Sequence, residues 1–248
     1  MYLAQSRISM SRTLSVDMKK LPYIIHEHVR TSDNGTGVDV LKKSKSYPRM
    51  ERVSLAYSPL TTSLGDALSK RTSLRSMDFS SPISIENIGT LLHHALGIRE
   101  DRRRRYPSGG AVYPIETYLF IQKSTVVKRG AYHYQTATHA LEHLWDIPDP
   151  LDMFSDRPTN AWADAAPLIL TFTAVWESNC EKYGDFGYYL GMLEAGHMAQ
   201  NVLLVATALN LSACPLGRFN DAAVTRILDL NTSIEQPLYA IAVGHKKK

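Results

Sequence analysis

The spacing of apolar residues predicts two helices in the first half of the chain. Residues 84–97 (SIENIGTLLHHALG) begin with Ser84 as a candidate N-cap and end at Gly97, a residue typical of helix C-termini. Residues 61–71 (TTSLGDALSKR) predict a shorter helix with Thr or Ser at its N-cap. In the longer segment, helical spacing predicts one buried stripe formed by Ile85, Ile88, Leu92 and Leu96.

The second half of the chain alternates strand-like segments with helices. Residues 186–209 predict a long helix whose second half is apolar on every side, which is typical of a helix buried in the core. Residues 212–219 (SACPLGRF) predict a loop, and residues 221–230 predict a short helix. Aromatic and β-branched residues predict a strand, a hairpin, a buried strand and a terminal strand at residues 111–122, 131–144, 166–175 and 237–245. Because the strands come singly or in a hairpin, the pattern favours an α+β fold over a doubly wound sheet.

The N-terminal residues 1–59 are polar and weakly periodic, with a turn signal at residues 33–35 and a basic segment, LKKSKS. We expect an N-terminal extension that packs on a main domain of residues 60–248. The histidines of residues 26–28 (HEH) have no cysteine or third histidine near them in the sequence. We therefore expect a surface or locally bonded pair of histidines there rather than a metal site.

Composition indicates the cellular compartment of the protein but leaves its function open. The chain has 248 residues, 44% of them hydrophobic and 21% charged, and a net charge of +4. This mildly basic balance is compatible with nucleic acid, an acidic peptide or a bound phosphate. Two cysteines without a CxxC pairing, and an N-terminus without the apolar core of a signal peptide, indicate a reducing, cytoplasmic setting. The longest apolar run, residues 202–206, is too short to span a bilayer, so no membrane partner is expected.

Two basic elements could hold an anion. Residues 71–75 (RTSLR) place a hydroxyl between two guanidinium groups, whose forked donors match a phosphate. The alternative is a basic helix end that the helix dipole favours. Residues 102–110 (RRRRYPSGG) join four arginines to a turn in which Gly109 and Gly110 allow close approach of a flat ring to the backbone.

The long helix carries polar residues that share one face. They lie at steps of three and four, and inside a core each would need a partner or would cost about 1–3 kcal/mol. Bonding to neighbouring loops and contact with a ligand or a second subunit both explain the pattern. These residues are Glu194, His197, Gln200 and Asn201. A Glu-x-x-His pair also occurs in di-iron bundles, but the sequence holds no second copy, so no metal is expected.

Lys182 and Tyr183 stand together just before the long helix. Such a pair can take a proton at neutral pH if both side chains reach one cavity. Neighbours on extended backbone point to opposite faces, however, so an ordinary surface pair is the open alternative. The motifs GxGxxG, GxxxxGK[ST], GxSxG and HExxH are absent from the sequence, which argues against a Rossmann domain and an α/β-hydrolase.

Three segments together make the sequence similar to a known family: residues 71–98, 102–120 and 182–221. Over residues 60–245 the chain resembles the SagB/ThcOx-type azoline dehydrogenases of the FMN-dependent nitroreductase superfamily. The stretches YPSGGAVYPIE, LEAGHMAQN and ACPLGRF carry the resemblance, and residues 1–59 match only loosely. The resemblance implies a nitroreductase-like α+β homodimer with a mainly antiparallel central sheet, a long buried central helix and two FMN molecules at the subunit interface.

The resemblance also implies an activity. Family members oxidise thiazoline and oxazoline rings in ribosomally made precursor peptides to thiazoles and oxazoles, beside a cyclodehydratase that makes the rings. Lys182 and Tyr183 stand where the family has its proposed catalytic base, with a hydride passing to FMN. The alternatives are a general NAD(P)H-dependent flavin reductase or nitroreductase, and a non-catalytic scaffold of a cyclodehydratase complex. Nucleic-acid binding ranks last, because the sequence has no recognisable reader module.

The resemblance implies the FMN contacts residue by residue. Contacts to the phosphate and ring are expected from Arg71, Ser73 and Arg75. The turn expected against the isoalloxazine consists of Pro107, Ser108 and Gly109. The loop whose backbone approaches the flavin contains Leu216 and Gly217. The C-terminal residues expected at the phosphate are His245 and Lys246, and the long helix contributes Gln200 and Asn201.

Overall fold

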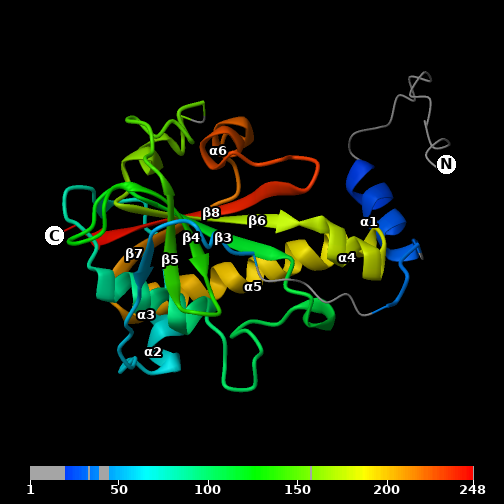
Figure 1. Ribbon diagram of the computed structural model, residues 1–248, viewed down its shortest axis with the longest axis horizontal. Helices are drawn as coiled ribbons and strands as arrows, with labels where there is room; N and C mark the ends of the chain where they lie inside the picture. The colour runs from blue at the N-terminus through cyan, green and yellow to red at the C-terminus, as the bar shows by residue number, and fades with distance from the viewer. Residues whose placement is uncertain (1–19, 33, 39–44, 157, 248) are drawn as a thin grey trace.

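The computed structural model describes residues 20–32, 34–38, 45–156 and 158–247 (Figure 1). Its helices are α1 (Leu21–Thr31), α2 (Leu64–Lys70), α3 (Ile85–Leu96), α4 (Trp176–Tyr183), α5 (Phe186–Ala208) and α6 (Asp221–Leu228). Its strands are β1 (Arg52–Ser54), β2 (Met77–Asp78), β3 (Ile115–Ile121), β4 (Gly130–Gln135), β5 (Ala140–Trp145), β6 (Leu168–Val175), β7 (Leu211–Leu216) and β8 (Glu235–Lys246). Two short 3₁₀ turns lie at Gly109–Ala111 and Ala161–Ala165.

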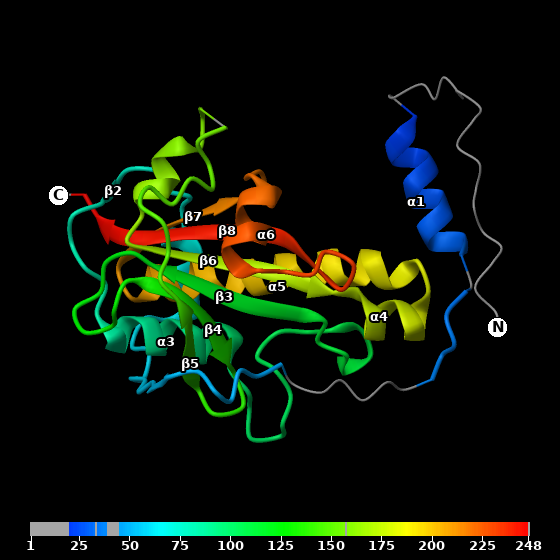
Figure 2. The ribbon, with the colours of Figure 1, turned by 45° about the horizontal axis from the view of Figure 1, so that its top comes forward.

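The strands form one sheet in the order β1-β5-β4-β3-β6-β8-β2, and β7 pairs with β8 beside this path. All of these strand pairs are antiparallel. The C-terminal half of β8 lies between β6 and β7, and the end of β8 pairs with β2 (Figure 2). The predicted α+β class with a mainly antiparallel sheet is therefore confirmed.

Alternate residues of the central strands face two separate cores. On one face Leu119 packs with α3 and α5, where Leu92 and Val202 are fully buried. On the other face Tyr118 packs with α6, where Val224 is fully buried. Figure 1 shows α5 and α3 below the sheet and α6 above it. This two-sided burial explains why β3 reads as a continuous apolar run rather than an alternating one.

The caps predicted for α3 are present. The Ser84 hydroxyl accepts a hydrogen bond from the Asn87 N–H at 3.1 Å, and the Gly97 N–H donates to the His93 carbonyl at 3.0 Å. Each bond satisfies a backbone group that a helix end leaves without an intrahelical partner. Of the predicted stripe, Ile88, Leu92 and Leu96 are buried, and Ile85 packs at the edge of the same core.

Residues 45–54 pack across the outer face of the sheet. β1 pairs with β5, and Glu142 on β5 is fully buried beneath this segment. Its carboxylate accepts hydrogen bonds from the Tyr47 N–H at 2.9 Å, from the Arg52 guanidinium at 2.9 Å and from the Ser46 hydroxyl at 3.1 Å. A buried carboxylate needs such donors, so part of the predicted N-terminal extension completes the polar interior of the sheet.

One sequence prediction of secondary structure is wrong, and helix α4 is missed. The segment predicted as a loop at residues 212–219 is largely strand β7, because it pairs with β8 from Leu211 to Leu216. Pro215 is compatible with this strand because β8 is the named strand that pairs with β7, and the bridge on the other side of β7, from Ser73, is made to Ala213 rather than to Pro215. Helix α4 is not predicted, because its N-cap position is Val175, which offers no side-chain acceptor.

The second half of the long helix α5 is largely buried, as its apolar sequence predicts, whereas the first half leaves large apolar side chains exposed. Tyr188, Met192 and Leu193 are 44%, 38% and 43% exposed in the single chain, whereas Met198 and Val202 are fully buried. The exposed residues lie in the first half of the helix, and the buried core contacts continue through its second half. Within the described part of the chain, none of the helices is long and apolar enough to cross a membrane.

Candidate active site

Lys182 and Tyr183 form the last two residues of α4, directly before the turn into α5. Gly184 follows with φ +57°, a left-handed backbone conformation that ends the helix. The pair therefore does not lie on extended backbone, where neighbouring side chains would point to opposite faces. On a helix, successive side chains are about 100° apart, so the two can approach one point.

That point is the turn at Gly110, which has φ +55°. A Cβ atom at Gly110 would lie 2.7 Å from the Lys182 Nζ and would also contact the Tyr183 hydroxyl oxygen. The Lys182 Nζ lies 5.3 Å from the centre of the Tyr183 ring, within cation–π range. Both side chains thus meet the same turn, and the geometric condition for a joint role in proton transfer is met.

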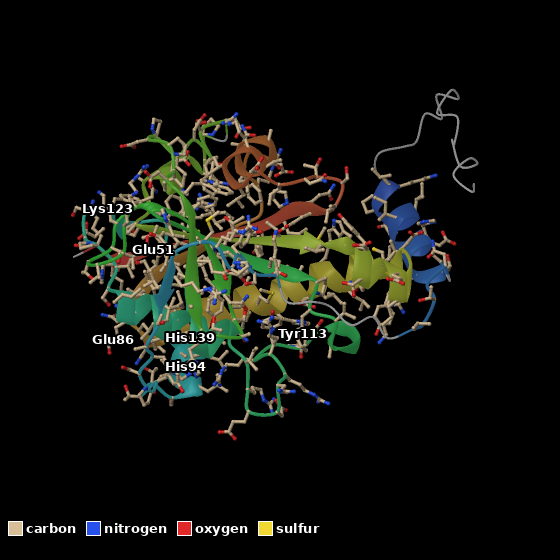
Figure 3. All side chains as sticks on the ribbon, in the orientation of Figure 1. Glu51, Glu86, His94, Tyr113, Lys123 and His139 are labelled. Carbon is tan, nitrogen blue, oxygen red and sulfur yellow. The ribbon has the colours of Figure 1, made fainter. Side chains whose placement is uncertain are left out.

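The turn itself is held by its neighbours. The Ser108 hydroxyl accepts a hydrogen bond from the Tyr113 N–H at 2.9 Å, and a Cβ atom at Gly109 would lie 2.8 Å from Leu190 of α5. Tyr113, labelled in Figure 3, accepts a hydrogen bond from the Arg104 N–H at 3.2 Å. The Arg104 guanidinium lies 5.7 Å from the centre of that ring. The turn is therefore fixed by its own loop and by α5.

A second arginine of the RRRR run also has an internal partner. The Arg105 guanidinium lies 2.9 Å from the His93 Nε2, and His93 stacks on Tyr57 with ring centres 3.4 Å apart. Burial, and then the Arg105 charge, lower the pKa of His93 to about 4, so the neutral ring accepts this hydrogen bond near neutral pH. His94 and His139 lie close by (Figure 3), but among the described residues no group of three His, Cys, Asp or Glu side chains could hold a metal.

A pocket of about 530 Å³ opens beside the Lys-Tyr pair. Residues from α1, from the segment after it and from the junction of α4 and α5 line it: Arg30, Ser32, Gly35, Thr36, Gly37, Lys182, Tyr183 and Phe186. The histidines of residues 26–28 contact the start of α5, since the His28 Nε2 lies 2.9 Å from Asp185 and the His26 ring contacts Tyr189 edge-on. Residues 20–32 and 34–38 thus contribute to the surroundings of this pair, which sequence analysis does not predict.

The predicted phosphate contacts gather at a different place, beside β7 and the end of β8. Residues 71–75 follow α2 and run along β7, where Ser73 bridges to Ala213 and the Leu74 N–H donates to the Ala213 carbonyl at 3.1 Å. The Arg71 guanidinium lies 3.5 Å from the Ser73 hydroxyl. Arg75 lies beside Cys214: burial raises the pKa of this thiol, and the guanidinium opposes the shift.

The C-terminal residues reach the same edge. Lys246 pairs with Met77 on β2, and its Nζ donates to the Asn210 side chain at 2.7 Å. The His245 Nε2 lies 3.2 Å from the Pro82 carbonyl oxygen. We call the group formed by Arg71, Ser73, Arg75 and Lys246 the cationic edge. Its arginine and lysine charges and the Ser73 hydroxyl are the groups that a phosphate monoester requires.

The other residues predicted to contact FMN, on α5 and at the end of β7, differ in their burial and bonding. The Asn201 amide donates to the Ala95 and Arg105 carbonyls, both at 3.1 Å, so it bonds to the last turn of α3 and to the loop that follows that helix. Glu194 is 2% exposed, but His197 and Gln200 lie on the exposed side of α5. The prediction that all four polar residues lie inside a core is therefore wrong for these two. At the end of β7, Leu216 is buried and Gly217 is exposed.

One chain does not bring the cationic edge to the Lys-Tyr pair. The pair precedes the N-terminus of α5, whereas Asn210, which binds Lys246, follows its C-terminus. A helix of 23 residues is about 35 Å long. Figures 1 and 2 show α4 and the C-terminus at opposite ends of the molecule. The predicted catalytic pair and the predicted phosphate contacts therefore lie near opposite ends of α5.

Comparison with known proteins gives relatives of two kinds. Protein MJ1384 of Methanocaldococcus jannaschii, named as a nitroreductase, is 33% identical over 74% of this chain and 91% of its own. The microcin B17-processing protein McbC of Escherichia coli is 29% identical over 63% of this chain and 60% of its own. The matched region thus spans less than two thirds of McbC.

Solved structures share the fold. The E. coli microcin synthetase McbBCD complex with truncated pro-MccB17 bound matches with a TM-score of 0.62 and 24% identity, over 94% of this chain and 95% of the matched one. A nitroreductase from Desulfovibrio desulfuricans in complex with FMN matches with a TM-score of 0.54 and 19% identity, over 76% and 88% of the two chains. These likenesses confirm the nitroreductase-like fold that the sequence implies.

The family model of the nitroreductases matches residues 68–245. This range contains Arg71, Ser73 and Arg75 of the cationic edge as well as the Lys-Tyr pair, and it covers well over half of the chain. The chain belongs to the nitroreductase family.

Proposed function

We propose that this protein is an FMN-dependent dehydrogenase that oxidises thiazoline or oxazoline rings in a ribosomally made peptide to the aromatic azoles. The observation that carries the proposal is the convergence of Lys182 and Tyr183 on the turn at Gly110. Both side chains are half-buried and line the 530 Å³ pocket. The similarity to McbC, whose name describes the processing of microcin B17, supports a peptide substrate.

The chemistry of FMN matches the cationic edge and the turn at Gly109 and Gly110. The cationic edge offers the charge and the hydroxyl that a phosphate needs, and the turn at Gly109 and Gly110 offers backbone without Cβ atoms to a flat ring. When bound, FMN supplies the acceptor for a hydride, and dioxygen can reoxidise it with formation of hydrogen peroxide. The FMN-bound structural neighbour supports this choice of cofactor.

The working unit in this proposal is a homodimer. A single FMN cannot contact residues about 35 Å apart, but the cationic edge of one chain and the Lys-Tyr pair of a second chain can face one cofactor. The exposed side of α5 supports this arrangement, because Tyr188, Met192 and Leu193 leave large apolar side chains in solvent in the single chain. A symmetric pair would form two equal sites.

In our proposal, residues of the protein accept the proton. Conversion of an azoline to an azole removes one proton and one hydride from the ring, and a ring C=C bond forms from the electrons of the broken C–H bond. In our proposal Lys182 or Tyr183 takes the proton, while the turn and α5 hold the ring in place. The McbBCD complex with its bound pro-peptide supports a cyclodehydratase as the partner that supplies the azoline.

Mass spectrometry of an azoline peptide incubated with the FMN-loaded protein tests this function. We expect a loss of about two hydrogens per ring with the wild-type protein, because that is the stoichiometry of a two-electron aromatisation. The Lys182→Ala/Tyr183→Phe double variant should retain its yellow cofactor and lose the reaction. Full turnover by the double variant would remove these two residues from the mechanism.

A second candidate is a flavin reductase or nitroreductase that uses NAD(P)H. The similarity to MJ1384, which covers 91% of that protein, favours it. Rapid bleaching of the bound FMN by NADPH, without any change in the mass of an azoline peptide, would support this candidate over the first.

A further inference from the structure

The N-terminal residues 34–37, here called the capping segment, lie directly against the helix end that carries Lys182 and Tyr183. We infer that the capping segment positions this pair for the reaction, so the inference rests on the proposed function. Residues 34–37 are separated from the pair by about 150 positions in the sequence. Their role is therefore a tertiary one, which can be tested by changing the segment alone.

The capping segment supplies the hydrogen bonds that the end of α4 lacks. The last four carbonyls of an α-helix have no partner within the helix. The Thr36 N–H donates to the Glu181 carbonyl at 2.9 Å, and the Gly37 N–H donates to the Lys182 carbonyl at 3.0 Å. The Thr36 hydroxyl also donates to the Glu181 carbonyl, at 2.9 Å. Two of the four carbonyls are thus bonded by this segment, and one of them belongs to Lys182 itself.

Gly35 packs against the same helix end without any space for a side chain. A Cβ atom at Gly35 would lie 2.5 Å from the Lys182 carbonyl oxygen, 2.6 Å from the Tyr183 carbonyl carbon and 2.7 Å from the Gly184 nitrogen. All three are backbone atoms, which cannot rotate away as a side-chain tip would. An alanine at position 35 must therefore move the capping segment away from the end of α4.

Asn34 fixes the first turn of α5 on the other side of the junction. Its side-chain oxygen accepts a hydrogen bond from the Asp185 N–H at 3.0 Å. The Ser32 hydroxyl lies 2.9 Å from the same oxygen and 3.0 Å from the Asp185 carboxylate. Asp185 has no side-chain cap of its own for α5, so Asn34 provides this contact from outside the helix. The segment thereby ties the end of α4 to the start of α5, with the Lys-Tyr pair between them.

This attachment determines where the two side chains stand relative to the turn at Gly110. The atoms nearest to a Cβ at Gly110 belong to the Lys182 and Tyr183 side chains, so a frayed last turn of α4 would let both drift from that turn. A displacement of about 1 Å can lower the rate of a positioned reaction by about 100-fold. We therefore assign Asn34 and Gly35 as positioning residues rather than catalytic ones.

Chemical labelling of Lys182 in the FMN-loaded protein tests the assignment without relying on turnover. The protein is pulsed with acetic anhydride, and the rate of Lys182 acetylation is measured by peptide mass spectrometry relative to the exposed Lys128. Gly35→Ala and Asn34→Ala should each raise this ratio about 3-fold or more, because loss of capping bonds frays the helix end. Val38→Ala is the matched control, since this neighbouring side chain is 62% exposed and should leave the ratio unchanged.

Turnover of an azoline peptide is then compared in the same variants. Gly35→Ala should lower kcat by about 10-fold or more with FMN still bound, and Val38→Ala should not. An unchanged Lys182 ratio in both Asn34→Ala and Gly35→Ala would overturn the inference. If the wild-type protein does not oxidise the peptide, the proposed function fails, while the labelling ratio still decides whether the segment holds the helix end.

Discussion

Substitution of Gly110 by alanine tests the geometry of the candidate site most directly. Gly110 has φ +55°, and a Cβ atom there would lie 2.7 Å from the Lys182 Nζ. Ordinary contact begins near 3.4 Å, and the Tyr183 hydroxyl oxygen would lie closer still than the Nζ, so the two side-chain tips or the turn must move by at least about 0.7 Å. If a 1 Å misplacement costs about 100-fold in rate, this shift should lower kcat for azoline oxidation by roughly 10- to 30-fold.

The same substitution has a separate effect on stability. A non-glycine residue in the left-handed region costs about 1–2 kcal/mol, which corresponds to a drop in Tm of about 2–8 °C for a chain of this size. Thermal unfolding followed by circular dichroism measures this cost, and the absorbance of bound FMN shows whether the cofactor remains. The loss of kcat should therefore exceed what the small fraction of unfolded protein at the assay temperature explains.

Gly65→Ala provides the matched control for Gly110→Ala. Gly65 lies in α2, and a Cβ atom there would meet only the Ser63 hydroxyl oxygen, at 3.9 Å. Alanine inside a helix is favoured over glycine by about 0.5–1 kcal/mol, so this variant should be slightly more stable and fully active. If Gly110→Ala turned over azoline peptide as fast as Gly65→Ala, the convergence of the Lys-Tyr pair on this turn would have no catalytic meaning.

Two further predictions concern the interior and the assembly. Glu142→Gln should lower the free energy of unfolding in urea by about 3 kcal/mol, because it leaves the buried donors around this carboxylate poorly matched. Burial raises the pKa of Glu142, but hydrogen bonds from His133, Tyr47 and Ser46 outweigh this effect and hold the pKa below its ordinary value. The stability of the wild-type protein should therefore fall as the pH drops below about 4.5, and the variant should lose this pH dependence. An equally steep loss of stability in the variant would assign the dependence to other groups. Co-expression of equal amounts of Arg71→Ala chains and Lys182→Ala/Tyr183→Phe chains should restore about a quarter of wild-type azoline oxidation, because half of the dimers are mixed and one of their two sites is intact. No recovery in dimers shown to be mixed would place each site within a single chain.

The features that sequence analysis predicts correctly depend on neighbouring residues. The caps of α3 are an example, because Ser84 and Gly97 act within one helical turn of where they stand. The strands β3 and β6 are predicted because their continuous apolar character follows from burial on both faces. Local chemistry suffices in these cases, and the tertiary structure agrees with it.

The features that it misses depend on contacts between distant segments. The Pro-Leu-Gly sequence of residues 215–217 reads as a loop, but pairing with β8 makes the residues before Gly217 a strand. Helix α4 has no local cap, and its end is completed by residues about 150 positions earlier. The turn signal at residues 33–35 includes a residue outside the described part of the chain, and nothing near it in the sequence indicates that Gly35 packs on Tyr183.

The length of α5 explains why the candidate site could be predicted by residue type but not located in one chain. Sequence similarity identifies which residues belong to a site, and it carries no information on whether they come from one copy or two. The structure shows that Lys246 and Tyr183 lie beyond opposite ends of a helix about 35 Å long. The first half of that helix also exposes Tyr188 and Leu193 in the single chain. The homodimer that we propose would explain both observations, because a second copy that covers this exposed face would also bring its own Lys-Tyr pair towards the cationic edge of the first.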